Sequence, residues 1–141
     1  MTESTPSTAG QPDAEVIALA GKLFDAARAG DAQLLAAYLD GGAPANLSNE
    51  GGDSLLMLAA YNQQAAAVSV LLERGADPNR ANDRGQTPLA GAVFKGSVEI
   101  VDALLAAGAD PHGGVPSALD AARMFGKHEL IAKLTAPAAG A

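Results

Sequence analysis

Short apolar segments with helical spacing alternate along this chain with polar segments rich in glycine, asparagine and aspartate. In one such segment, Val98, Val101 and Leu105 recur at intervals of three and four residues, which is the spacing of one face of an α-helix. A shorter apolar segment, 89–95, comes just before it and is separated from it by Gly96. The pattern therefore predicts a pair of helices, the first short and the second longer, joined by a tight turn.

The residues around this pair are those that begin and end helices. Residues 82–86 contain Asn, Asp and Gly, which favour turns. Thr87 offers a hydroxyl oxygen to the first free N–H groups, and Pro88 suits the first helical position, where its missing N–H costs nothing. Gly108 follows the second helix and can adopt the left-handed backbone that ends one. One unit thus consists of a turn, a short helix, a turn, a longer helix and a loop.

This unit recurs along the chain. Gly42, Gly75 and Gly108, each followed by Ala, lie 33 residues apart. Gly96 and Gly126 are only 30 residues apart, so we expect the loop before the last unit to be about three residues shorter. A shared period of this length indicates a stacked repeat architecture, in which no unit buries its apolar face alone. The large aliphatic residues expected in the core are Leu23, Leu34, Leu35, Leu56, Leu58, Val68, Leu71, Leu72, Leu89, Val101, Leu104, Leu105, Leu119 and Leu134.

The third unit, residues 82–110, resembles a nearly complete ankyrin repeat. It contains the run Asn82-Asp83-Arg84-Gly85-Gln86-Thr87-Pro88-Leu89, then Gly96, then Val98-Glu99-Ile100-Val101, and it ends with Gly108-Ala109-Asp110. Residues 49–81 resemble a second repeat, with Ser-Leu-Leu in place of Thr-Pro-Leu and Gln63 where Gly is usual. The resemblance implies an all-α ankyrin-repeat solenoid of helix-turn-helix units with short β-hairpin-like loops and about four repeats.

The same register divides the chain into one repeat domain with two tails. The first tail is rich in Ser, Thr and Pro and is expected to be disordered, and the second is short and rich in Ala. We expect one long first helix that fuses a cap with the first repeat. The predicted parts are an N-terminal tail at 1–11, a repeat domain at 12–135 with repeats at 12–48, 49–81, 82–114 and 115–135, and a C-terminal tail at 136–141.

Composition narrows the classes of function. Hydrophobic residues make up 48% of the chain but aromatic residues only 4%, which suits thin, closely packed helices. The net charge of −7 and the lack of a Lys/Arg cluster disfavour nucleic acid as a partner. No apolar run approaches the ~20 residues that span a membrane, so no membrane is expected either. The first residues lack the basic and apolar regions of a secretion signal, which predicts a cytoplasmic protein.

No group of residues indicates catalysis. The chain has no cysteine and two histidines, His112 and His128, and neither has a second ligand at a spacing typical of metal sites. The carboxylates of Glu50 and Asp53 fall in a predicted exposed loop, where a solvated role is expected. We therefore predict no enzyme activity, no cofactor and no metal.

A partner surface is implied by the resemblance. Ankyrin repeats bind partners on a concave face made of the hairpin tips and the exposed side of the first helices. Three of the chain's aromatic residues, Tyr61, Phe94 and Phe125, match this face, where they serve either as a partner surface or as structural packing. By matching positions, the residues expected to contact a partner are Arg28, Glu50, Asp53, Tyr61, Asn62, Asp83, Arg84, Gln86, Phe94, Lys95, Met124 and Phe125.

The expected function is that of a protein–protein interaction module whose partner is another protein. Acidic residues on the hairpin tips suggest a partner with some basic character. Three alternatives remain open: a dedicated inhibitor or stabiliser of one enzyme, a self-associating scaffold, and an enzyme whose site is not recognised. We expect a monomer, with a homodimer as the alternative, because an exposed aromatic surface can also pair with itself.

Overall fold

The structure is a computed structural model that describes residues 14–136. The N-terminal tail predicted at 1–11 lies outside the described residues, as does all of the predicted C-terminal tail except Ala136. Within this range the chain forms eight helices and no β-strand, which confirms the all-α fold predicted from the sequence. The helices are α1 (Ala14–Ala29), α2 (Ala32–Asp40), α3 (Leu55–Tyr61), α4 (Ala65–Glu73), α5 (Pro88–Lys95), α6 (Val98–Ala106), α7 (Ala118–Met124) and α8 (His128–Thr135).

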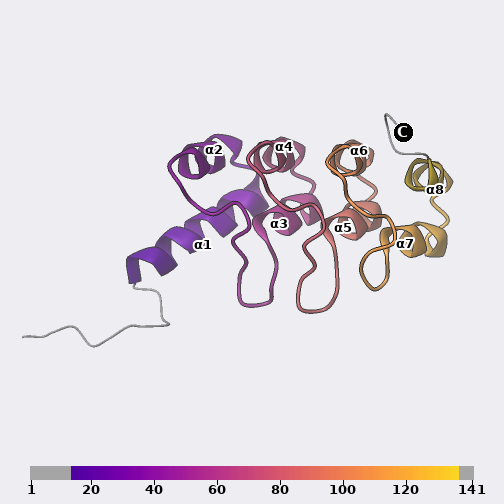
Figure 1. Cartoon of the computed structure of the whole chain (residues 1–141), viewed down its shortest axis with the longest axis horizontal. Coiled ribbons are helices and arrows are strands. Elements are labelled where there is room, and N and C mark those ends of the chain that lie inside the picture. Colours follow the sequence, from indigo (N-terminus) through magenta and orange to yellow (C-terminus); the bar gives the residue numbers. More distant parts are fainter. Residues whose placement is uncertain (1–13, 137–141) are drawn as a thin grey trace, which may run out of the picture.

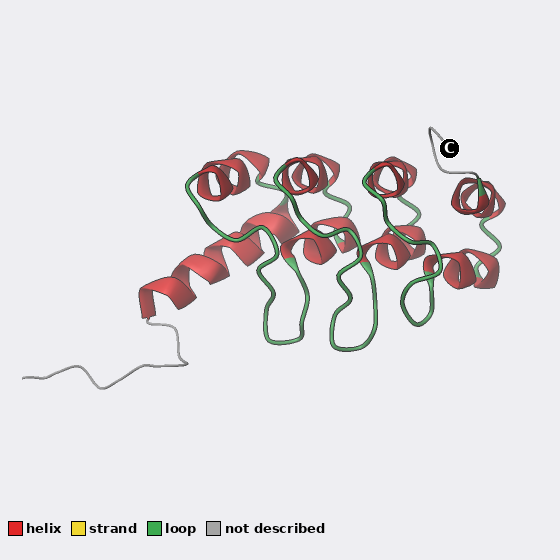
Figure 2. Cartoon of the chain, viewed as in Figure 1, coloured by secondary structure: helices red, strands yellow, loops and turns green. Residues whose placement is uncertain are grey.

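The helices lie in two layers (Figure 1). The inner layer contains α1, α3, α5 and α7, each packed on the next, and the outer layer contains α2, α4, α6 and α8 in the same order. Figure 2 shows three loops that project from the inner layer on the side away from the outer helices. None of the helices in residues 14–136 is long and apolar enough to cross a membrane.

Three of the inner helices, α3, α5 and α7, begin where a buried hydroxyl caps them. Ser54 accepts a hydrogen bond from the N–H of Met57 at 3.0 Å, and Thr87 accepts one from Ala90 at 3.1 Å. Ser117 does the same at the start of α7. These three hydroxyls are at least nine-tenths buried, so their hydrogen bonds also satisfy polar atoms that water does not reach. The cap predicted at Thr87, with Pro88 in the first turn, is confirmed.

A residue with left-handed backbone ends each inner helix. It is Gly30 after α1 (φ 82°), Gly96 after α5 (φ 76°) and Gly126 after α7 (φ 62°). After α3 the equivalent residue is Gln63, also at φ 62°, which is a conformation that residues with a side chain adopt at a cost. The tight turn between the helices of a pair therefore keeps its shape in all four repeats, whichever residue occupies this position.

Small residues allow the inner helices to pack closely. Ala59, Ala92 and Ala122 occupy equivalent positions in α3, α5 and α7, and each is fully buried. Leu34, Leu72 and Leu105 were predicted in the core but lie at its margin, partly buried against it, because on each outer helix the neighbouring leucine faces the core and they are turned partly toward solvent. The largest fully buried side chains are Leu23, Leu35, Leu55, Leu56, Val68, Leu71, Pro88, Leu89, Val93, Ile100, Val101 and Leu104.

The three loops stack on one another. Loop 1 (residues 41–54), loop 2 (74–87) and loop 3 (107–117) each join an outer helix to the next inner helix, and loop 3 is three residues shorter, as predicted. The N–H of Asp83 in loop 2 donates to the carbonyl of Gly51 in loop 1 at 3.0 Å. The N–H of Val115 in loop 3 donates to the carbonyl of Gly85 in loop 2 at 2.9 Å. These hydrogen bonds hold the loops in a row beside the inner helices.

Candidate functional site

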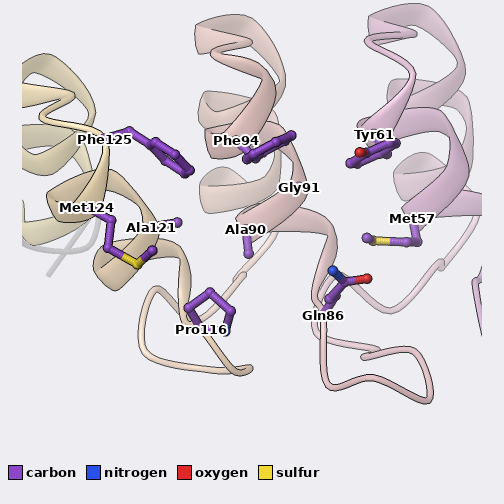
Figure 3. A pocket seen from close by; sticks show the side chains of 10 residues that line it. All are labelled: Met57, Tyr61, Gln86, Ala90, Gly91, Phe94, Pro116, Ala121, Met124 and Phe125. Carbon is purple, nitrogen blue, oxygen red and sulfur yellow. The ribbon is translucent and has the colours of Figure 1, made fainter.

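Three aromatic rings form a row across the ends of the inner helices. The rings of Tyr61 and Phe94 lie 6.2 Å apart between centroids and are nearly parallel, with 4° between their planes. The ring of Phe125 meets that of Phe94 edge to face, with 5.4 Å between centroids. The three residues are 40%, 50% and 49% exposed, in the order Tyr61, Phe94, Phe125. We call these three residues the aromatic row (Figure 3).

The helical repeat explains how the row is built. Tyr61 and Phe94 are 33 residues apart and lie at equivalent positions in the last turns of α3 and α5. Because the next repeat is offset by 30 residues, Met124 is the equivalent of Phe94, and Phe125 is the equivalent of Lys95. The ring of Phe125 thus comes from a position one residue later in its repeat than those of Tyr61 and Phe94. Tyr61 and Phe94 stack, whereas Phe125 meets Phe94 edge to face.

A lysine flanks the aromatic row at its Tyr61 end. The ammonium nitrogen of Lys95, on α5, lies 4.6 Å from the centroid of the Tyr61 ring, on α3. This distance is within the range of a cation–π interaction, which contributes roughly 0.5–1 kcal/mol at an exposed site. The interaction links two neighbouring repeats and holds the Tyr61 ring in place within the row.

An apolar hollow of about 260 Å³ lies beside the aromatic row, between the inner helices and the loops. Figure 3 shows Met57 and Met124 on the loop side of the rings, with Gln86 of loop 2 and Pro116 of loop 3 beyond them. The residues that line this apolar hollow are Met57, Tyr61, Gln86, Ala90, Gly91, Phe94, Pro116, Ala121, Met124 and Phe125.

The absence of a side chain at Gly91 helps to form this hollow. Gly91 lies inside α5, where glycine weakens a helix relative to alanine. A Cβ added there would lie 3.5 Å from the methyl carbon of Met57 and 3.5 Å from the Tyr61 ring, which is ordinary van der Waals contact. A methyl group therefore fits at this position without a clash, and its effect would be to fill part of the wall of the hollow.

A second, more polar hollow adjoins the first. It measures about 280 Å³ and is lined by Asp53, Met57, Leu58, Tyr61, Arg84 and Gln86. Asp53 accepts a hydrogen bond from the side-chain amide of Asn82 at 2.8 Å, and the same amide donates to Gln86 at 2.9 Å. The amide oxygen of the buried Asn82 accepts from the N–H groups of Arg84 and Gln86, which fixes the backbone of loop 2.

Most of the residues predicted to contact a partner lie together. Tyr61, Gln86, Phe94, Met124 and Phe125 line the apolar hollow, Asp53 and Arg84 line the polar hollow, and Lys95 lies over Tyr61. Exposed Glu50 and Asp83 lie near the tips of loops 1 and 2, and exposed Asn62 uses its side-chain amide to bond the carbonyl of Leu58. Neither hollow is lined by Arg28, Glu50, Asn62 or Asp83, and Arg28 pairs with Asp25 on α1 at 3.1 Å. Whether any of them contacts a partner stays a prediction.

Several residues that line the hollows were not predicted from the sequence. Met57 and Ala90 lie one helical turn before Tyr61 and Phe94, so their spacing of four residues would have placed them on the same face. Ala121 and Gly91 could not be recognised as site residues, because a small residue inside a helix usually indicates close helix packing. Pro116 lies in the shortened loop 3, whose path could not be transferred from the longer loops 1 and 2.

The described residues show no arrangement suited to metal chemistry. Within residues 14–136 no group of three or more His, Asp or Glu side chains is placed to hold a metal ion. What the hollows offer instead is exposed aromatic area, two methionine side chains and a few polar groups at one end. Such a surface suits the burial of another apolar group better than a reaction.

Two comparisons with known proteins concern the repeats. A family model described as ankyrin repeats (3 copies) matches residues 23–113, which is more than half of the chain. A protein of Pseudomonas aeruginosa named "Putative ankyrin repeat protein PA3287" is 46% identical over 64 residues. That match covers 45% of this chain and 37% of the relative, so the chain spans well under half of the relative's length in the matched region.

Proposed function

Because this chain belongs to the ankyrin-repeat family, we propose that it binds another protein through its inner face. The inner face is defined as the exposed side of α3, α5 and α7 together with loops 1 and 2. Ankyrin repeats are generally protein–protein interaction modules, and the family is typically non-enzymatic. The choice of the inner face over the outer helices is our own and rests on the side chains described above.

The observation that carries the proposal is the exposure of the aromatic row. Its three rings pack against one another, yet each leaves two-fifths or more of its surface in contact with water. Aromatic side chains bury a large area with few rotatable bonds, which is why they are enriched among the residues that dominate interface energies. Packing between the rings and binding by their exposed faces are compatible, since the packing holds them ready for a partner.

In this proposal the residues of the inner face have different roles. Tyr61, Phe94, Met124 and Phe125 supply the apolar contact area, and the tips of loops 1 and 2 supply polar contacts at its edge through Glu50, Asp53, Asp83, Arg84 and Gln86. Lys95 orients Tyr61. Arg28 and Asn62 extend the surface toward the first repeat. The chain acts as a monomer, because a net charge of −7 opposes the approach of two copies.

The test is affinity capture from a lysate of the host, quantified by mass spectrometry, with two double variants of equal charge. Tyr61→Glu/Phe94→Glu places two carboxylates on the inner face. Ala66→Glu/Ser69→Asp places two on the exposed side of α4, where they reproduce the Glu99 and Asp102 that the third repeat carries at equivalent positions. Circular dichroism verifies that both variants are folded.

We expect a protein that wild type and the α4 variant enrich equally and that the inner-face variant loses. If the inner-face variant retains it, the binding surface lies elsewhere and the proposal is wrong. One partner held in a one-to-one complex would identify a dedicated inhibitor or stabiliser, whereas several weaker partners would identify an adaptor. A mass that doubles with concentration in light scattering, with no other protein captured, would identify a self-associating scaffold instead.

A further inference from the structure

The apolar hollow and the polar hollow are two parts of one groove. Met57, Tyr61 and Gln86 line both of them, so these three side chains form a shared wall. The apolar hollow extends from this wall to Phe94 on α5 and Met124 on α7. The polar hollow extends from it to Asp53 and Arg84 on the loops. A partner segment that follows the groove meets an apolar surface first and a charged one directly beyond the wall.

The size of the apolar hollow suits a single large side chain. Its volume of about 260 Å³ is below the roughly 300–1,000 Å³ of sites that enclose a drug-sized ligand. Its walls include three aromatic rings and the side chains of Met57 and Met124, which adapt to apolar groups of different shape. An aliphatic or aromatic residue of a partner would therefore replace water against these rings.

The charges around the groove favour a cation on the partner. Glu50, Asp53 and Asp83 lie on the two loops, and none takes part in an ion pair of the described residues. Exposed Asp120, likewise unpaired, occupies in α7 the position that Met57 and Ala90 occupy in α3 and α5.

Two cations, Lys95 and Arg84, lie at the groove itself. The ammonium group of Lys95 lies over the Tyr61 ring, which leaves Arg84 as the cation that lines the polar hollow. The net charge of −7 makes a second copy of this chain a poor occupant of the groove.

We infer that the groove recognises a peptide segment of another protein that presents one bulky apolar residue with Lys or Arg nearby. This inference rests on the proposed function and adds the chemistry of the partner to it. The apolar residue occupies the hollow beside the aromatic row, and the cation pairs with Asp53, whose carboxylate keeps free lone pairs beside its hydrogen bond from Asn82. Since only one wall separates the two hollows, the cation follows or precedes the apolar residue by roughly two to four residues of extended chain.

Selection from a random peptide library displayed on phage tests the inference directly. The full-length wild-type chain is the target, and peptides that also bind Tyr61→Glu/Phe94→Glu are discarded. We expect the remaining peptides to share a Leu, Ile, Met, Phe or Trp with Lys or Arg at the spacing given above. Enrichment of acidic peptides, of peptides without a bulky apolar residue, or of no peptide at all would overturn the inference.

Fluorescence polarisation with the best synthetic peptide then separates the two hollows. Replacing its apolar residue with Ala, or its cation with Glu, is expected to weaken binding about tenfold at low salt. On the protein, Asp53→Asn retains an oxygen for the bond from Asn82 and removes only the charge, and it is expected to weaken binding about threefold or more. Glu99→Gln, which removes one carboxylate from the exposed side of α6, is the matched control and should leave the affinity unchanged. An Asp53→Asn variant that binds as well as wild type, or a Glu99→Gln variant that loses as much affinity, would contradict the role given to Asp53.

The two failures can be told apart. If the inner-face variant loses a captured host protein while selected peptides prove acidic, the proposed function stands and the partner chemistry is wrong. If peptides of the expected class bind but host proteins are captured equally by the inner-face variant, the groove has the inferred chemistry but the proposed function is wrong.

Discussion

Replacing Gln63 with glycine should stabilise the fold, and the four repeats show why. Gln63 is at φ 62°, and the equivalent positions hold Gly30 at 82°, Gly96 at 76° and Gly126 at 62°. In each case the next residue donates a backbone hydrogen bond that closes the turn, as Gln64 does to the carbonyl of Ala59 at 2.9 Å. The turn therefore imposes the left-handed conformation, and Gln63 adopts it without the freedom that glycine has.

The magnitude follows from two opposing effects. A left-handed backbone costs a residue with a Cβ roughly 1–2 kcal/mol relative to glycine. Glycine in turn loses more conformational freedom on folding, which costs roughly 0.4–1 kcal/mol. The expected gain in the free energy of unfolding for Gln63→Gly is therefore about 0.5–1 kcal/mol. With a urea dependence of roughly 2 kcal/mol per molar for a small protein, the unfolding midpoint should rise by about 0.3–0.5 M.

Equilibrium urea unfolding followed by far-ultraviolet circular dichroism measures this change. Gly96→Gln is the reciprocal control, because an added Cβ at Gly96 would meet only the Lys127 ammonium nitrogen at 3.5 Å, so sterics contribute little. This control should lower the free energy of unfolding by a similar amount. A Gln63→Gly variant that is no more stable than wild type, together with a tolerated Gly96→Gln, would refute the argument from backbone conformation.

Three further predictions concern the site and the stack. Gly91→Ala should raise the free energy of unfolding by up to about 1 kcal/mol in urea unfolding, because alanine favours the helix. The same change should weaken partner binding, because the methyl group fills part of the hollow, and tighter binding would contradict the role of the hollow. Asn79→Ala removes the hydrogen bonds to the Asp110 N–H and the Gly108 carbonyl and should lower the free energy of unfolding by about 1 kcal/mol in the same assay. An unchanged midpoint would show that these exposed hydrogen bonds contribute nothing. Leu104→Ala in the fully buried core should cost about 2–5 kcal/mol, and a loss below 1 kcal/mol would mean that the outer helices repack.

Much of the fold could be predicted because local residue chemistry and the period agree. Thr87, Pro88 and Gly96 mark the ends of α5 in the sequence, and the structure places them there. The 30-residue offset between Gly96 and Gly126 correctly predicted the shorter loop 3. Both features depend on residues close together in the chain, where turn and cap preferences act directly.

The geometry of the candidate site could be predicted only in part. Equal positions in successive repeats placed Tyr61 and Phe94 on one face, and the matching position of Lys95 placed it near them. Side-chain rotamers and the spacing between helices determine how the rings contact one another and where the Lys95 ammonium group lies over Tyr61. Neither quantity is encoded in a sequence pattern, so the hollow between the rings and the loops could not be predicted, although several of its lining residues were.

Site-specific photo-crosslinking in the host cell tests most directly whether the inner face binds another protein. Benzoylphenylalanine replaces Phe94 in one variant and Ser69, on the exposed side of α4, in the other. Irradiation of the Phe94 variant should give an adduct that contains a second, different protein, and the Ser69 variant should give none. An adduct from the Ser69 position alone, or none from either position, would contradict the account.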